Sequence, residues 1–192
     1  MPQKNQDALD FLLTRRSRPA KTLQPPVPDR DTLRMLLTAA ARTPDHGKLE
    51  PWRFIVLEGE AFARLSHLVA ERGGALGKSP EDITKAQGQF DMANLAVVVV
   101  ESPKPSEKIP PLEQTYSAGS VCLALLNASL AAGWGANWLS GWPSHDPEFC
   151  SKGLGLEPHE RVAGLIHIGT ETNAPPERPR PDVEAITAWV SE

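Results

Sequence analysis

Apolar residues that recur three or four positions apart predict helices in several parts of the chain. The clearest pattern follows Asp29 and Asp31, either of which can cap a helix, and it places Leu33, Leu36 and Ala40 on one face. Proline, glycine and capping residues set the approximate limits of each helix. The predicted helices cover residues 7–14, 29–42, 60–72, 80–88, 113–132, 147–154 and, most weakly, 183–190.

Stretches rich in branched apolar residues predict four strands, at residues 53–57, 95–100, 135–140 and 161–169. The second of these is apolar throughout, which is typical of a strand covered on both faces and predicts the centre of the sheet. Gly73, Gly74 and Gly77 predict a loose connection between two helices. Because helices and strands do not alternate regularly and no repeat is evident, the pattern favours a single α+β domain over residues 1–192.

The composition narrows the choice of partner and compartment. The 192 residues carry a net charge of -4, and the 20 lysines and arginines are spread along the chain, which argues against nucleic acid or a membrane surface as a partner. Cys122 and Cys150 offer neither a disulfide framework nor a CxxC motif, so we expect a reducing compartment. The first residues do not resemble a secretory signal, and we expect a cytoplasmic protein.

Residues 115–132 are uncharged over nearly the length that a bilayer requires. Polar and small residues interrupt this stretch, among them Tyr116, Ser117, Gly119 and Asn127. We therefore interpret it as a buried core helix and not as a membrane span. Small residues also let another helix approach closely, so the same stretch can line a subunit interface.

The sequence has no GxGxxG after a strand and no GxxxxGK[ST], so a bound phosphate has to be held in another way. Arg15, Arg16 and Ser17 follow the first predicted helix and offer two guanidinium groups and a hydroxyl. Arg178 and Arg180, at the end of a proline-rich segment, can supply the other side of such a site. The alternative is that the first pair is a solvated helix end and the second a solvated tail.

A second cluster combines a guanidinium, a carboxylate and an imidazole, from Arg42, Asp45 and His46, on the turn before a predicted strand. The alternative is a turn capped by Asp45 with an exposed histidine. A metal hydrolase is disfavoured, and we predict no metal site, because no two histidines have a familiar ligand spacing. The residues that such a site would gather are Asp45, His46, His145, Asp146 and His159.

Three tryptophans, Trp134, Trp138 and Trp142, recur at every fourth position among glycines. The glycines argue for a strand and turns instead of a helix. The tryptophans are then either part of the core or an aromatic wall beside a flat ligand.

These segments occur in the order that is seen in the nitroreductase family, and the chain most closely resembles its YdjA-like branch of NAD(P)H nitroreductases. The resemblance covers nearly the whole chain. The segments that carry it are Arg15-Arg16-Ser17, Arg42-Thr-Pro-Asp-His46 with Pro51-Trp52, Glu113-Gln-Thr-Tyr-Ser-Ala-Gly119, Trp138-Leu-Ser140 and Gly164-Leu-Ile-His-Ile-Gly169.

This resemblance implies the nitroreductase-like sandwich, with a mixed, mainly antiparallel sheet flanked by helices, and an intertwined homodimer that binds FMN at its interface. On this resemblance, Arg15, Arg16 and Ser17 hold the FMN phosphate and neighbouring ring atoms. A late basic residue, Arg180 or less readily Arg178, completes the phosphate site.

The resemblance also implies residues around the flavin ring. Trp138, Leu139 and Ser140 line the isoalloxazine, and Arg42 and His46 reach the same flavin from the partner chain. The implied function is an oxidoreductase that passes a hydride from NADH or NADPH through flavin N5 to a small acceptor, such as a nitroaromatic, a quinone or an enone, in ping-pong order. No side chain is assigned as a catalytic acid, because the flavin carries the chemistry.

Two alternatives of other classes remain open from the sequence. One is a flavin-binding or flavin-processing protein on the same fold, without nitroreductase activity. The other is an interaction module without flavin, built on a degenerate copy of the fold.

Overall fold

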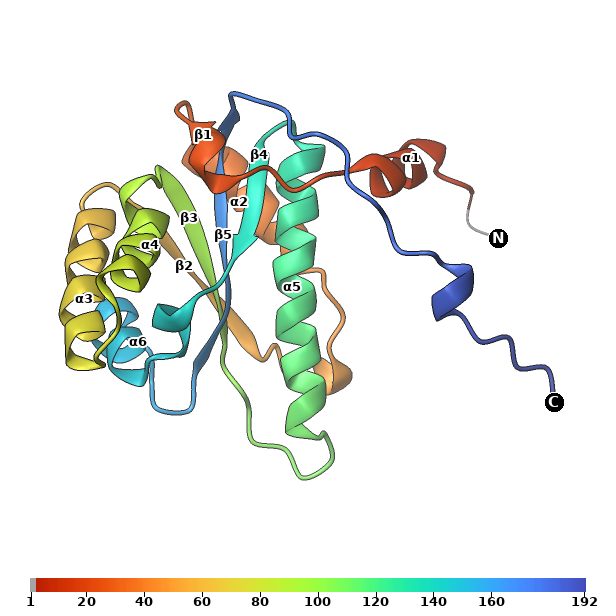
Figure 1. The fold of residues 1–192 in the computed structure, drawn as a ribbon. Helices are drawn as coiled ribbons and strands as arrows, with labels where there is room; N and C mark the ends of the chain where they lie inside the picture. Colours follow the sequence, from red (N-terminus) through yellow and green to blue (C-terminus); the bar gives the residue numbers. More distant parts are fainter. Residues whose placement is uncertain (1–2) are drawn as a thin grey trace.

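Figure 1 shows a computed structural model of the protein, in which residues 3–192 are described. The helices are α1 (Gln6–Thr14), α2 (Arg30–Ala40), α3 (Ala61–Ala75), α4 (Pro80–Asp91), α5 (Pro111–Ala131) and α6 (Pro147–Leu154). The strands are β1 (Leu23–Gln24), β2 (Trp52–Glu58), β3 (Leu95–Glu101), β4 (Gly135–Leu139) and β5 (Arg161–Glu171). The prediction of an α+β fold is confirmed.

The five strands form one sheet in which every pairing among the described residues is antiparallel. β5 lies inside the sheet, since it pairs with β3 on one edge and with β4 on the other. Its last residues also pair with β1, and β2 pairs with the far edge of β3. The pairing of β4 with β5 ends at Leu139 and Leu165, so the first part of β5 has lost its neighbour on that edge.

Helices cover both faces of the sheet, α3, α4 and α6 on one side and α2 and α5 on the other (Figure 1). β3 is buried along its whole length, and successive residues point to opposite faces. Val98 therefore packs with α3, α4 and α6, whereas Val97 packs with α2 and α5. This explains why the strand is apolar at every position except its last, and it confirms the prediction for residues 95–100.

Three details of the predicted elements are corrected by the structure. Gly73 and Gly74 belong to α3 and not to a loop. A Cβ on Gly73 would lie 2.5 Å from Ile83 Cγ1, so the glycine lets α3 and α4 approach closely. The helix predicted at residues 183–190 is wrong, because only the short 3-10 turn Glu184–Ile186 forms there. The two-residue strand β1 was not predicted.

The parts outside the sandwich are α1 and the segment after β5, which both extend away from the sheet (Figure 1). α5 runs along the sandwich beside β4, and its 21 residues span about 30 Å. Within residues 3–192 no helix has both the length and the apolar character that crossing a membrane would require.

Candidate functional site

The segment after α1 is laid over β4 by backbone hydrogen bonds. α1 ends at Thr14, and the chain becomes extended at Arg15. The backbone N–H of Arg18 donates to Ala136 O at 2.8 Å, and Asn137 Nδ2 donates to Arg18 O at 2.6 Å. These bonds hold the intervening Arg15-Arg16-Ser17 segment against the start of β4.

The segment after β5 returns to the same place and completes a cavity of about 320 Å³, which we call the arginine cradle. Arg16 Nη1 donates to Pro176 O at 2.6 Å and lies 3.2 Å from Glu177 Oε1, which also pairs with Arg180 at 3.0 Å. The cradle is lined by Arg15, Arg16, Ser17, Pro19, Asn137, Pro175, Arg178 and Arg180. The structure therefore brings together the two groups of basic residues that lie at opposite ends of the sequence.

The cradle has more cationic groups than its own carboxylates can neutralise. Glu177 faces Arg16 and Arg180, and Glu171 pairs with Arg18 at 2.6 Å. With Arg15 and Arg178 included, five guanidinium groups meet two carboxylates, which leaves an excess of positive charge. Such an excess in a concave site attracts an anion.

Arg15 is half-buried at the cradle. Its Nη2 donates to Ser17 Oγ at 3.1 Å, but its Nε is buried without an acceptor in the described residues. Burial, and then the charges of Arg180, Arg16 and Arg18, lower the pKa of Arg15. A buried donor without a partner is costly in a folded protein, so this nitrogen marks a place that an anionic ligand would fill. A phosphate fits such a set of donors.

β4 continues from the cradle into the predicted ring-lining residues. The indole of Trp138 is 38% exposed and lies against Gly164, where a Cβ would come within 2.0 Å of the indole Nε1. Leu139 is half-buried and Ser140 exposed. The Trp138–Ser140 segment thus directly follows Asn137 of the cradle along β4, and it presents an exposed aromatic side chain.

The other two tryptophans have a different role. Trp134 packs against the core between the sheet and α5, and Trp142 packs against the core on the opposite face. The core interpretation holds for these two residues, whereas Trp138 is exposed enough to meet a ligand.

The second predicted cluster lies near the N-terminal end of α5. His46 Nδ1 lies 2.6 Å from Glu113 Oε2 in the first turn of α5, and Asp45 Oδ1 accepts hydrogen bonds from Leu49 N and Glu50 N. Arg42 is exposed on the turn after α2. Since α5 separates this cluster from the arginine cradle, one chain does not bring the two together.

Some residues of the cradle were not predicted from the sequence. Pro19 and Pro175 contribute walls, and Asn137 both lines the cavity and holds the backbone of Arg18. The position of Asn137 was a usable signal, because an amide in the middle of an otherwise apolar strand needs a polar partner.

Other chemistries find little support in the described residues. Residues 3–192 contain no group of three or more histidine, cysteine, aspartate or glutamate side chains placed to hold a metal ion. Both cysteines are free and buried, and burial raises the pKa of Cys122 to about 12 and that of Cys150 to about 11. Thiols with such pKa values are protonated near neutral pH and are poor nucleophiles.

The chain is similar in sequence to known nitroreductases. The sequence model of the nitroreductase family matches residues 12–170. "Putative NAD(P)H nitroreductase YdjA" of Escherichia coli (strain K12) is 34% identical over 164 residues, which cover 85% of this chain and 88% of that protein.

Solved structures share the fold. A nitroreductase-like family protein from Bacillus cereus superposes with a TM-score of 0.81 and 23% identity, covering 100% of both chains. A "putative nitroreductase in complex with fmn" from Desulfovibrio desulfuricans has a TM-score of 0.74 and 17% identity, covering 99% of this chain and 100% of that one.

Proposed function

The chain belongs to the nitroreductase family and is an oxidoreductase, and we propose that it uses FMN to pass electrons from NADH or NADPH to a small organic acceptor. The observation that carries this proposal is the arginine cradle, together with the exposed aromatic side chain of Trp138, which follows Asn137 of the cradle along β4. A phosphate at the cationic end and a flat ring at the aromatic end match the two ends of FMN.

In this proposal each part of the surface has its own task. Arg15, Arg16 and Ser17 bind the FMN phosphate from one side, and Arg180 binds it from the other. Guanidinium groups suit this task because their planar forks match the oxygens of a phosphate. The ring is oriented by the residues that follow along β4, namely Trp138, Leu139 and Ser140.

We also propose that the working unit is a homodimer, in which Arg42 and His46 of one chain face the flavin held by the other. Apolar side chains that are exposed in the single chain support a partner of this kind. On α5 they share one side of the helix. These residues are Leu9, Leu12 and Leu13 of α1, Leu112, Tyr116 and Leu123 of α5, and Val183, Ile186, Trp189 and Val190 of the final segment.

When bound, FMN supplies the hydride chemistry at its N5 atom. The protein would contribute by binding the phosphate and by orienting the ring beside Trp138. The nicotinamide would leave before the acceptor is reduced, which is a ping-pong order. The acceptors that we propose are small planar molecules, such as nitroaromatics, quinones and enones.

The absorbance spectrum of the purified protein tests this proposal. The protein is mixed with FMN, desalted and then titrated without oxygen with NADH and with NADPH. We expect retained bands near 450 nm that bleach with at least one nicotinamide. Retained bands that do not bleach would favour a flavin-binding protein without reductase activity, and no retained flavin would refute the proposal.

A further inference from the structure

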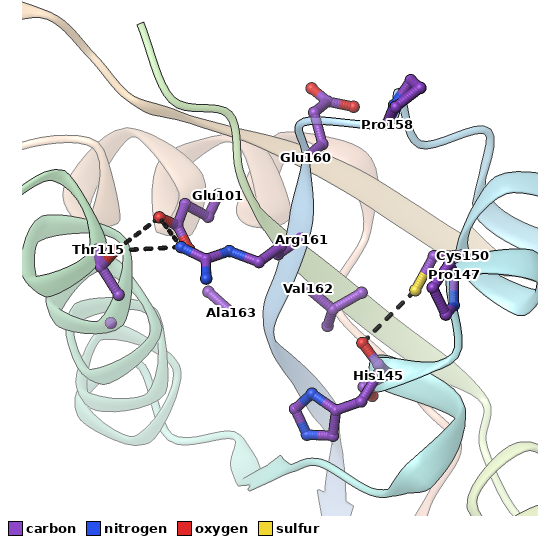
Figure 2. A pocket seen from close by; sticks show the side chains of 12 residues that line it. Glu101, Thr115, His145, Pro147, Cys150, Pro158, Glu160, Arg161, Val162 and Ala163 are labelled. Carbon is purple, nitrogen blue, oxygen red and sulfur yellow. Dashed lines mark hydrogen bonds and ion pairs between the residues drawn. The ribbon is translucent and has the colours of Figure 1, made fainter. Parts of the chain in front are cut away.

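A second cavity opens where β4 leaves the sheet. β5 loses its β4 neighbour before Leu165, so residues 161–164 border open space on that edge. α5 lies on one side of this space, and the 3-10 turn Trp142–His145 and α6 lie on the other (Figure 2). The cavity has a volume of about 470 Å³, within the range of small-molecule sites. We call it the edge cleft.

Arg161 lines the edge cleft and pairs there with a buried carboxylate (Figure 2). Its Nη2 donates to Glu101 Oε1 at 2.7 Å and to Thr115 Oγ1 at 3.3 Å, and Thr115 Oγ1 donates to the same carboxylate oxygen at 2.7 Å. The Glu101 side chain is only 6% exposed, whereas that of Arg161 is 63% exposed. A buried carboxylate therefore anchors one terminal nitrogen of a guanidinium that otherwise faces the cleft.

The remaining hydrogen-bonding capacity of Arg161 is that of a donor. Within residues 3–192, neither its Nη1 nor its Nε has a hydrogen-bond acceptor, although a guanidinium carries five N–H groups. The second carboxylate of the cleft, Glu160, already accepts bonds from Arg53 Nε at 2.8 Å, from Arg53 Nη2 at 2.6 Å and from Glu157 N at 3.1 Å. The cleft thus offers free N–H donors on Arg161, and each of its two carboxylates already pairs with an arginine.

The walls beside this donor are apolar and adjoin the proposed flavin surface. Val162 and Ala163 of β5 line the cleft together with Pro147 and Pro158. Ala163 directly precedes Gly164, against which Trp138 lies. A molecule in the edge cleft would therefore lie next to the ring-lining segment of the same chain.

We propose that the edge cleft binds the electron acceptor, and that this acceptor is a small planar molecule with a carboxylate that Arg161 binds. The free edge of a guanidinium matches a carboxylate through two parallel hydrogen bonds, and the apolar walls suit an aromatic or enone body. Glu101 and Thr115 are positioning residues, because they act through Arg161. This inference rests on the proposed function, since it names the substrate class of the same enzyme.

A pair of acceptors of similar shape, one anionic and one neutral, tests the inference. We compare kcat/KM for 4-nitrobenzoate and 4-nitrobenzamide in the wild type and in the double variant Arg161→Gln/Glu101→Gln, which removes the guanidinium without leaving a buried carboxylate unpaired. The ratio of the two kcat/KM values should fall at least about tenfold in the variant. Arg34→Gln, at an exposed position of α2, is the matched control and should leave the ratio unchanged.

Two further measurements complete the test. Arg161→Lys keeps the charge but not the fork, so it should recover only part of the ratio. Titration of the purified holoprotein with benzoate, followed by calorimetry, reports on the cleft without turnover, and its heat should be lost in the double variant.

The outcomes separate the inference from the function on which it rests. If nitro compounds are reduced but neither the ratio nor the benzoate heat depends on Arg161, the inference is overturned and the proposed function stands. If benzoate binds through Arg161 but no acceptor is reduced, the proposed function fails, and with it the assignment of the cleft to an acceptor.

Discussion

Replacing Arg15 by methionine should change the stability of the free protein and its affinity for FMN in opposite directions. Methionine keeps the length and the apolar stem of the side chain but removes the charge. In the free protein, Arg15 buries an Nε without an acceptor and lies among other cations that lower its pKa. The methionine variant is relieved of both penalties and loses one hydrogen bond, to Ser17 Oγ.

The magnitudes follow from these contacts. A buried polar group without a partner costs about 1–3 kcal/mol, and the lost hydrogen bond is worth about 0.5–1.5 kcal/mol. The free energy of unfolding without FMN should therefore stay equal or rise by about 1 kcal/mol. Losing a charged partner of the phosphate costs about 1.5–3 kcal/mol of binding, so the FMN dissociation constant should rise about 10- to 150-fold.

Urea unfolding with and without saturating FMN, together with a fluorescence titration of FMN, measures both quantities. Arg34→Met is the matched control, because Arg34 is 73% exposed on α2 and pairs only with Asp31 among the described residues. Its effects should stay within about 0.5 kcal/mol. If Arg15→Met destabilises the free protein by more than about 1 kcal/mol, or leaves FMN affinity unchanged, Arg15 is a structural residue and the reasoning is wrong.

Three further predictions concern parts of the structure that do not depend on a ligand. Hydrogen bonds from Arg53 lower the pKa of Glu160 to about 2. This pair therefore stabilises the fold above about pH 4.5, and its contribution is lost as the pH falls towards 2. The urea midpoint of unfolding should drop over that pH interval, and it should drop less steeply in Arg53→Met. Gly164→Ala places a methyl group against the Trp138 indole. It should lower the free energy of unfolding by about 1–3 kcal/mol and shift the tryptophan emission. An unchanged emission spectrum together with an unchanged urea midpoint would contradict the packing of Trp138 on Gly164. Asp146→Ala removes both the N-cap of α6 and the partner of Arg72. It should lower the free energy of unfolding, measured in urea, by about 3 kcal/mol, and Asp146→Asn should lie closer to the wild type. A decrease below about 1 kcal/mol would show that the pair contributes little to stability.

The helices and strands that the sequence predicts well are those that pack against the core on a regular face. α6 forms over the predicted residues, and β3 extends the prediction by one residue. The predicted helix at residues 183–190 has apolar residues at a helical spacing, but Val183 is 65% exposed and Trp189 is 83% exposed. A short helix without packing is marginal, so the spacing alone does not form one.

For the candidate site, residues that are adjacent in the sequence can be recognised together, whereas residues that only the fold brings together cannot. Arg15 and Arg16 are adjacent in the sequence and can be recognised together, whereas Arg180 joins them only because β5 ends beside the start of β4. Arg161 was not predicted at all, since a lone arginine at the start of a strand is ordinarily solvated. Its importance depends on Glu101, which is 60 positions away and becomes a neighbour through the pairing of β3 with β5.

The separation of the two clusters by the length of α5 has a genetic consequence. In the proposed dimer, each flavin site takes its cradle from one chain and its Arg42–His46 turn from the other. A chain with Arg16→Ala that pairs with a chain with Arg42→Ala therefore forms one site with both substitutions and one site with neither. Two inactive variants, expressed together, should complement each other and restore up to one intact site in each mixed dimer, which no pair of variants within the cradle can do.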